Sequence, residues 1–155
     1  MLNMSEYGEL YFVAGGKSVT IATAGTPVTI AALVAGDSRY TVLNASAGKI
    51  KLAKGKHLVR AHVGVKCTAG AQEVGLNVAT LQAGTTAAVA KSKAVGLADA
   101  TDPVAITSEA IVTSDGTTEV LVQVSNEGSN DNLTVETVQF LAIGLDTQPP
   151  RPGTP

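Results

Sequence analysis

The sequence predicts an all-β domain, a β-sandwich or a barrel, and two features of its pattern carry this prediction. Glycines in small polar clusters, such as Gly16, Gly36, Gly55 and Gly116, recur along the whole 155-residue chain. Between them lie short runs that alternate apolar and polar residues or are rich in β-branched residues. Turn signals about every 8–12 residues with runs of this kind are typical of sandwiches and barrels. The length suits one domain with a sizeable core.

About ten strands are expected. The clearest is 56–67, in which every odd-numbered position from Val59 to Cys67 is small and apolar and would face the core. Val120, Val122 and Val124 would do the same in a later strand. In chain order, the expected strands are 7–13, 18–23, 28–34, 39–43, 49–53, 56–67, 74–78, 104–113, 119–124 and 133–145.

The connections carry more specific predictions. Residues 35–38 are expected to form a turn, and Asp115-Gly116 between two apolar runs predicts a β-hairpin. The apolar positions of the last strand change parity after Val135, which predicts a β-bulge near Glu136 and Thr137. Residues 85–100 are ambiguous. Their Ala and Lys content favours a short helix, but the surrounding strands favour a strand or a covering loop.

Composition narrows the possible functions. A net charge of −2 and a pI near 5.6 give no electrostatic reason to expect nucleic-acid binding. No long apolar stretch or signal peptide is visible, so we expect no membrane span and synthesis in the cytoplasm. Charged residues make up 15% of the chain, against about 25% in an ordinary soluble domain. Part of the surface must therefore be apolar or uncharged, which favours oligomerisation.

No catalytic or zinc-binding motif stands out, so we expect neither an enzyme nor a cofactor. His57 and His62 lie five residues apart on one strand and therefore on opposite faces, as exposed or half-buried sheet histidines. Cys67, the only cysteine, shares the core parity and is expected to be a buried, small apolar residue.

The polar loop 125–132 is the one candidate for a cation site. Asn126, Glu127, Asn130 and Asp131 concentrate oxygen atoms there, as Ca²⁺ prefers. Their spacing does not match an EF-hand, and a solvated loop tip explains them equally well.

Basic side chains gather between residues 49 and 66 in an otherwise slightly acidic chain. Two alternatives remain open: a solvated outer face, or a docking patch for an acidic partner that adds orientation and association rate. The residues are Lys49, Lys51, Lys54, Lys56, Arg60 and Lys66.

Several segments, taken in order, resemble strands of one known fold. Residues 56–66, 74–78, 110–126 and 133–145 are similar to the middle, late and closing strands of the tumour-necrosis-factor-like jelly roll, which the globular heads of complement share. The opening Tyr7-Gly-Glu-Leu-Tyr11 is similar to the openings of many tailed-phage virion proteins with this fold. The resemblance covers about residues 7–145 and implies a jelly-roll β-sandwich that forms homotrimers. The aromatic residues that line the trimer axis in the eukaryotic family are lacking, so no receptor- or ligand-binding residue is carried over.

The Ala-, Val- and Thr-rich, Trp-free composition fits the phage branch of this resemblance. There it implies a head decoration (cement) protein, a trimer in the virion that binds the major capsid protein on the outer surface of the head. The alternatives are a tail fibre or baseplate protein and a carbohydrate-binding module for host attachment. Small size and extended chain ends favour decoration, and Tyr7, Tyr11 and Tyr40 are few platforms for a sugar.

We divide the chain into an N-terminal arm (1–6), the jelly-roll domain (7–145) and a Pro-rich tail (146–155) that is expected to be extended. Such ends could reach a capsid protein or a sister subunit. The candidate capsid contacts are Met1, Leu2, Asn3 and Met4 in the arm, Lys49, Lys51, Arg60 and Lys66 on the strands, and Pro149, Pro150, Arg151 and Pro152 in the tail.

Overall fold

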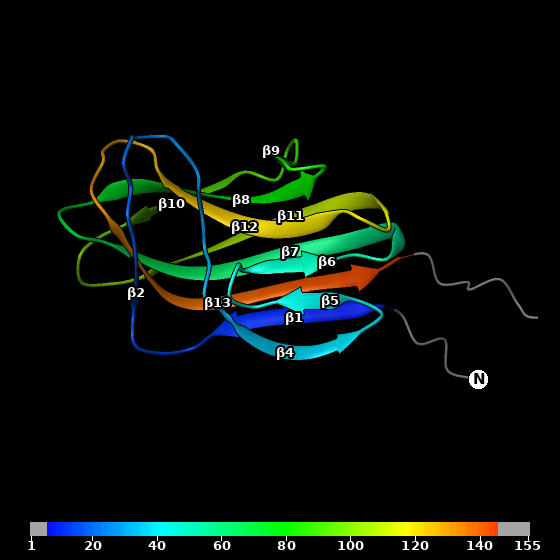
Figure 1. Ribbon diagram of the computed structural model, residues 1–155. Coiled ribbons are helices and arrows are strands. Elements are labelled where there is room, and N and C mark those ends of the chain that lie inside the picture. The colour runs from blue at the N-terminus through cyan, green and yellow to red at the C-terminus, as the bar shows by residue number, and fades with distance from the viewer. Residues whose placement is uncertain (1–5, 146–155) are drawn as a thin grey trace, which may run out of the picture.

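The computed structural model describes residues 6–145, and the regular structure within them is entirely β. Thirteen strands form two antiparallel sheets that pack face to face (Figure 1). The β-sandwich expected from the turn spacing is therefore confirmed. No helix in this part of the chain is long and apolar enough to cross a membrane.

The first sheet has five strands in one continuous order and a short sixth strand at its side. The order is β11 (Val104–Asp115), β7 (Lys54–Cys67), β13 (Leu133–Gly144), β1 (Tyr7–Phe12) and β4 (Val34–Arg39), with β2 (Lys17–Val19) also paired to β13. β13 therefore lies in the middle of this sheet, between the first strand of the chain and the longest one.

The second sheet is built around β12 and β8. Its order is β10 (Ala94–Ala98), β8 (Gln72–Gln82), β12 (Glu119–Asn126), β6 (Lys49–Lys51) and β5 (Val42–Asn44), with β3 (Val28–Thr29) also beside β12 and β9 (Thr85–Ala88) beside β8. After β7 the chain crosses repeatedly from one sheet to the other, so most neighbouring strands are not consecutive in sequence; the pairs β5–β6 and β8–β9 are the exceptions among the described strands.

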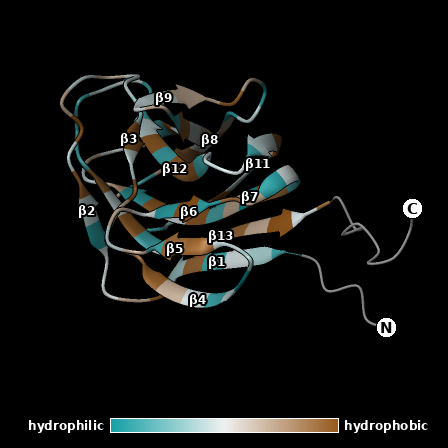
Figure 2. Cartoon of the chain, turned by 45° about the vertical axis from the view of Figure 1, so that its right-hand side comes forward, coloured by the Kyte–Doolittle hydropathy of each residue, from teal (hydrophilic) through white to brown (hydrophobic). Residues whose placement is uncertain are grey.

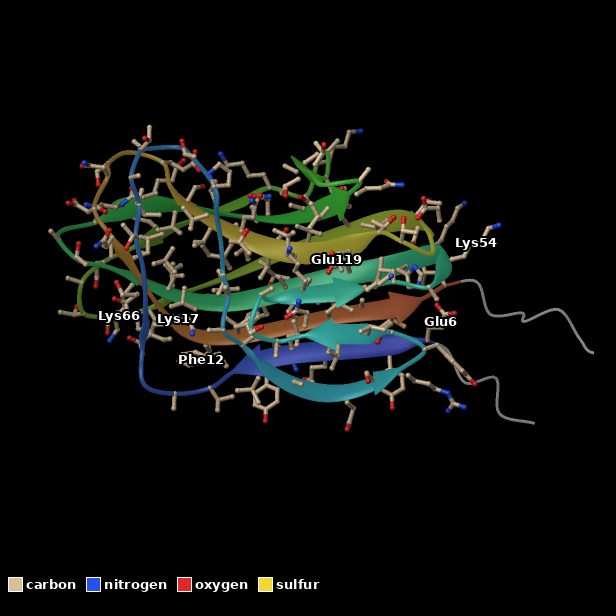
Figure 3. All side chains as sticks on the ribbon, in the orientation of Figure 1. Glu6, Phe12, Lys17, Lys54, Lys66 and Glu119 are labelled. Carbon is tan, nitrogen blue, oxygen red and sulfur yellow. The ribbon has the colours of Figure 1, made fainter. Side chains whose placement is uncertain are left out.

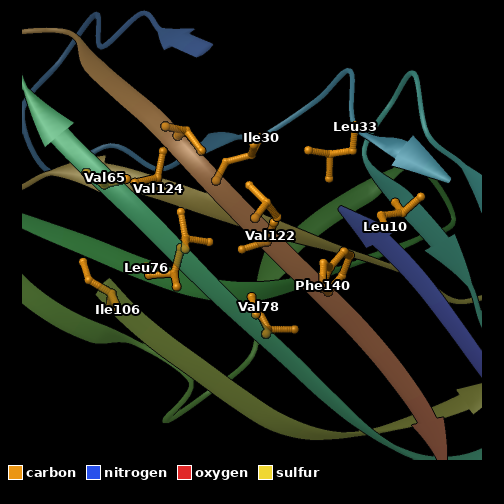
Figure 4. Packing of buried hydrophobic residues seen from close by; sticks show 14 of the residues in the cluster. Leu10, Ile30, Leu33, Val65, Leu76, Val78, Ile106, Val122, Val124 and Phe140 are labelled. Atoms are coloured by element: carbon orange, nitrogen blue, oxygen red, sulfur yellow. The ribbon is translucent and has the colours of Figure 1, made fainter. Parts of the chain in front are cut away.

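The core lies between the sheets and consists of the side chains that alternation assigned to it. Val59, Val63, Val65, Val122 and Val124 are fully buried, and Figure 4 shows several of them interleaved with Phe140 and Leu10. Each such side chain contributes about 1.5–3 kcal/mol by leaving water. Figure 2 shows hydrophobic and hydrophilic bands alternating along β7 and β12. Cys67, 3% exposed, belongs to this core as expected.

The β-bulge expected in the last strand is present. The register between β13 and β7 shifts between Val135 and Thr137. Because of this extra residue, Leu133 and Val135 before the bulge and Phe140 after it all face the core, although their parities differ.

The expected hairpin at Asp115-Gly116 is wrong. β11 belongs to the first sheet and β12 to the second, so this turn carries the chain across the sandwich. The local chemistry does form a tight turn, because the Asp115 Oδ1 atom accepts hydrogen bonds from the amide of Thr117 at 2.8 Å and from its hydroxyl at 2.7 Å. An Asp-Gly pair specifies the turn but not the partners of the flanking strands.

The turn expected at 35–38 is also wrong, because these residues lie inside β4. Strand β4 pairs with β1 at the edge of the first sheet, and their register shifts between Gly8 and Leu10. The side chain of Glu9 lies over Gly36, where an added Cβ would meet its Oε2 atom at 2.6 Å. Gly36 thus makes room within a strand for a neighbouring side chain. In the sequence, a glycine with this role looks the same as a glycine that marks a turn.

Thirteen strands replace the expected ten because β4 occupies the segment expected to form a turn, and because β9 and β10 lie in the ambiguous segment 85–100. Within 85–100 the structure has β9 and β10, which confirms the strand alternative over a helix.

Candidate functional site

The outer face of the first sheet carries an ordered arrangement of side chains. Its strands pair in register, so side chains from β1, β13, β7 and β11 form rows that run across the sheet. Residues directly opposite each other on neighbouring strands point to the same side and lie in contact range. Three consecutive rows have distinct chemistry.

The first row is apolar and is called the apolar row below. Tyr7 lies opposite Ile143, Ile143 opposite Leu58, and Leu58 opposite Ile111. Tyr7 and Ile143 are each 40% exposed and Ile111 is 62% exposed. Four apolar side chains in a line on adjacent strands form a continuous surface, unlike the singly scattered apolar residues of an ordinary surface.

The second row has charged side chains on three of its four strands. Glu9, Leu141, Arg60 and Glu109 face one another across the four strands, and the Nε atom of Arg60 donates to Oε2 of Glu109 at 2.8 Å. Both partners are about half exposed, at 52% and 51%. Such an exposed pair contributes little to stability, but it fixes the position of opposite charges beside the apolar row.

The third row is polar and consists of Tyr11, Gln139, His62 and Thr107. Here the surface has a hollow of about 370 Å³, lined by Glu9, Tyr11, Phe12, His62, Thr137 and Gln139 among others. The Nδ1 atom of His62 lies 2.7 Å from the Thr107 hydroxyl. At the margin, the ammonium group of Lys17 lies 5.1 Å from the centre of the Phe12 ring, and Figure 3 shows the two side chains at the same end of the sheet.

The basic residues expected to form a docking patch lie on both sheets. Lys49 and Lys51 are on β6 in the second sheet, whereas Arg60 and Lys66 are on β7 in the first. Arg60 is paired with Glu109, and the Nζ atom of Lys66 lies 3.5 Å from Oε1 of Glu136. The structure therefore does not bring these four residues together in one patch.

The other candidate contacts, Met1, Leu2, Asn3 and Met4 in the arm and Pro149, Pro150, Arg151 and Pro152 in the tail, lie outside the described residues. The two ends of the domain from which these segments continue are neighbours. The amide of Gly144 donates to the carbonyl of Glu6 at 2.7 Å, and Tyr7 pairs with Ile143. Both ends lie on one side of the sandwich in Figure 1, next to the apolar row.

His57 corrects the expectation of two exposed or half-buried histidines. It is 1% exposed, and its Nε2 atom lies 2.9 Å from Oε2 of Glu6, while its Nδ1 has no hydrogen-bond partner among the described residues. His62 is exposed, as expected. The odd parity that His57 shares with Val59 is the sequence signal for its burial, since histidine is of intermediate burial in proteins.

The oxygen-rich loop uses its polar groups internally. The buried Asn126 amide donates to Oε1 of Gln72 at 2.5 Å, while its Oδ1 accepts from the amide of Ser129 at 3.2 Å. The Oε2 atom of Glu127 lies 2.7 Å from Nζ of Lys93, which is outside the loop. Within residues 6–145 no group of three or more His, Cys, Asp or Glu side chains could hold a metal ion.

Sequence patterns could not reveal the rows. Alternation places Leu58 on the outer face of its strand, but Tyr7, Ile111 and Ile143 join it only through register between strands that are far apart in the chain. Of the two tyrosines in β1, one falls in the apolar row and the other beside the hollow.

The sheet orders and crossings described above define a jelly-roll β-sandwich of the tumour-necrosis-factor and complement C1q type. The similar solved structures include murine APRIL, with 13% identity, a TM-score of 0.60 and coverage of 90% of this chain and 99% of that chain. The globular domain of zebrafish complement 1qA protein has 11% identity, a TM-score of 0.61 and coverage of 92% and 98%.

Eiger TNF from S. frugiperda is similar to the same degree, with 11% identity, a TM-score of 0.61 and coverage of 94% of this chain and 97% of that chain. At these identities the likeness is one of fold alone. The sequence matches no protein-family model and no curated relative.

Proposed function

We propose that this chain is a non-enzymatic structural protein that assembles into homotrimers and decorates the head of a tailed phage, where it binds the major capsid protein and stabilises the shell. The observation that carries the proposal is the apolar row, which offers a ready surface for a second copy. The trimeric state and the phage setting come from the resemblance to phage virion proteins with a jelly roll. The observed fold supports the architecture that this resemblance implies.

Self-association gives the apolar row a physical purpose. In a single chain, solvent contacts 40% of the surface of Tyr7, 62% of Ile111 and 40% of Ile143. This exposure of apolar surface is unfavourable in free energy, and burial against another subunit removes it. In a closed ring of three subunits, the apolar row of every copy is buried. No copy then has an unfilled contact surface to which a fourth subunit could add.

The position of the chain ends supports decoration. Segments 1–5 and 146–155 continue from adjacent points beside Tyr7 and Gly144. A trimer would therefore present several copies of both segments around its apolar contacts. Several modest contacts that act together bind far more strongly than each does alone, and a ligand bound only to the closed shell stabilises it by mass action.

The test is co-sedimentation of the purified chain with expanded, DNA-free heads of the phage that encodes it, prepared without this protein. We expect saturable binding, together with a higher temperature of shell opening in a calorimetric scan. Variants that lack 1–5 or 146–155 identify which segment makes the contact, because loss of binding follows removal of that segment alone.

Two outcomes contradict the proposal. One is the absence of binding to heads by a correctly folded chain. The other is immunogold labelling of virions that marks the tail or baseplate and not the head, which would favour the fibre alternative.

A further inference from the structure

We propose that the Pro-rich segment 146–155 of one subunit occupies the hollow on the outer face of the first sheet in a neighbouring subunit. This contact rests on the proposed self-association, since it forms only where the outer faces of two copies meet. It gives the assembly a second contact beside the apolar row, and it leaves segment 1–5 to reach the capsid protein.

The hollow lies in the face that the proposed assembly covers. It forms next to the bulge in β13, which brings Thr137 opposite Gly64, a residue without a side chain. Close packing is the normal state of protein interiors, and surfaces that border a void lose their van der Waals contacts. A subunit contact over an empty hollow of about 370 Å³ would lose packing in this way. A segment that occupies the hollow restores it.

The lining suits a Pro-rich segment. Half of its eight residues are aromatic or aliphatic, namely Tyr11, Phe12, Val13 and Val138. Segments in the polyproline conformation dock into grooves lined by aromatic side chains, because they are extended before they bind. Residues 146–155 include four prolines, at positions 149, 150, 152 and 155.

The hydrogen-bonding groups of the two surfaces are also complementary. Proline has no backbone N–H, so a Pro-rich segment offers mainly carbonyl acceptors. The lining offers donors in the hydroxyl of Tyr11 and the side-chain amide of Gln139.

The charges of the hollow and the segment are opposite. Glu9 lines the hollow and has no ion-pair partner among the described residues. At the margin, the Nζ atom of Lys17 donates instead to the carbonyl of Ala32 at 2.8 Å. Arg151 is the only cation in segment 146–155. A pair between Arg151 and Glu9 would fix the register of the segment in the hollow.

The length of the segment allows it to reach a neighbouring hollow. Segment 146–155 begins next to Ile143 of the apolar row, where the proposed contact lies. In each copy, Gln139 of the hollow is four residues along β13 from Ile143, a distance of about 13 Å. The six residues from Leu145 to Arg151 span about 19 Å in the polyproline conformation.

The direction of the chain favours the neighbour over the subunit's own hollow. The amide of Leu145 donates to the carbonyl of Lys56 at 2.8 Å, so the chain continues along β7 beyond Gly144. This direction leads away from Gln139 of the same chain. To reach its own hollow, the segment would have to reverse and cover its own apolar row, which would block self-association.

The experiment is disulfide trapping between two co-expressed chains with different affinity tags. One chain carries Gln139→Cys in the hollow, and the other carries Gly153→Cys, which keeps Arg151 and all four prolines. Assemblies that contain both chains are isolated through both tags and oxidised, and the joined peptides are identified by mass spectrometry. Thr86→Cys replaces Gln139→Cys in the matched control, because Thr86 is exposed on β9 in the other sheet.

We expect at least about tenfold more product joined between positions 139 and 153 than between positions 86 and 153, because a disulfide requires Cβ atoms about 3.5–4.5 Å apart. Arg151→Glu in the second chain should lower the yield, since it places like charges together. Light scattering of the unmodified protein tells the two proposals apart. A trimer without the 139–153 product, or with equal yield from the control, overturns the tail contact alone.

Two further outcomes also overturn the proposal. One is a chain with both Gln139→Cys and Gly153→Cys that forms the disulfide within itself, since the segment then occupies its own hollow. The other is an unmodified protein that is monomeric at every concentration, which overturns the proposed self-association as well.

Discussion

A single buried amide organises the loop between β12 and β13. The side chain of Asn126 is fully buried. Its nitrogen donates to Gln72, to the hydroxyl of Ser129 and to the carbonyl of Asp131, and its oxygen accepts from two backbone amides of the same loop. A polar group this buried stabilises the fold only because its hydrogen bonds are all made.

We therefore expect Asn126→Ala to lower the free energy of unfolding by about 2–3 kcal/mol, because the fully buried amide is removed and several partly buried partners lose their hydrogen bonds together. Chemical denaturation followed by circular dichroism measures the change. Asn130→Ala, in the same loop but exposed, is the control and should stay within about 0.5 kcal/mol of the wild type. Equal effects of the two substitutions would show that Asn126 does not organise the loop.

At the scale of the element, the bulge in β13 and the glycine opposite it form one unit. Gly64 is buried with an ordinary backbone conformation, so only space limits its replacement. A Cβ there would lie 2.6 Å from the Thr137 hydroxyl oxygen but 3.8 Å from the Thr137 Cβ. The first distance is a clash and the second is normal contact.

Gly64→Ala should thus cost about 1–3 kcal/mol of stability, as overpacking does. Adding Thr137→Ala should recover much of that loss, because it removes the clashing oxygen and keeps the Cβ. A double-mutant cycle by urea denaturation measures the coupling between the two positions. Additive effects, with no recovery in the double variant, would refute this account of the bulge.

The turns that link the sheets hold two carboxylates in their charged form. Backbone hydrogen bonds from Asp102 and Thr101 lower the pKa of Asp99 below its ordinary value of 3.8. The hydroxyl and amide of Thr117 lower the pKa of Asp115 in the same way. These groups therefore stabilise the fold above the pKa of the unfolded chain, and the stabilisation is lost as the pH falls through the lower folded pKa.

It follows that Asp99→Asn and Asp115→Asn should each be less stable than the wild type at pH 7, and that this difference should shrink as the pH falls below about 4. Urea denaturation at a series of pH values measures the effect. A difference that stays constant with pH would mean that the carboxylate charge is not responsible.

At the scale of the whole molecule, the alternation of apolar residues predicted the sandwich, because burial between two sheets imposes a period of two on each strand. It placed the core residues of β7 and β12 correctly and located the bulge after Val135. The jelly-roll fold expected from the resemblance is also present. These features depend on local pattern, which the sequence carries.

Features that depend on pairing between distant segments were not visible in this way. Asp115-Gly116 specified a turn but not the sheet on each side of it, and Gly36 marked room for Glu9 and not a chain reversal. The apolar row arises from register across four strands, and the hollow arises from register across β1, β13 and β7. No single segment contains enough of either surface to reveal it.

The central claim at this scale is that the outer face of the first sheet joins copies of the chain. Ile111→Glu places a charge in the apolar row while altering an exposed side chain that the monomer does not need. Thr86→Glu on β9, exposed and in the other sheet, is the matched control.

The most direct measurement is the native mass of the purified protein by multi-angle light scattering. The account predicts a stable species of three times 15.6 kDa for the wild type and the Thr86→Glu control, and a single 15.6 kDa chain for Ile111→Glu. A wild-type protein that is monomeric at every concentration, or a trimer that Ile111→Glu leaves intact, would contradict it.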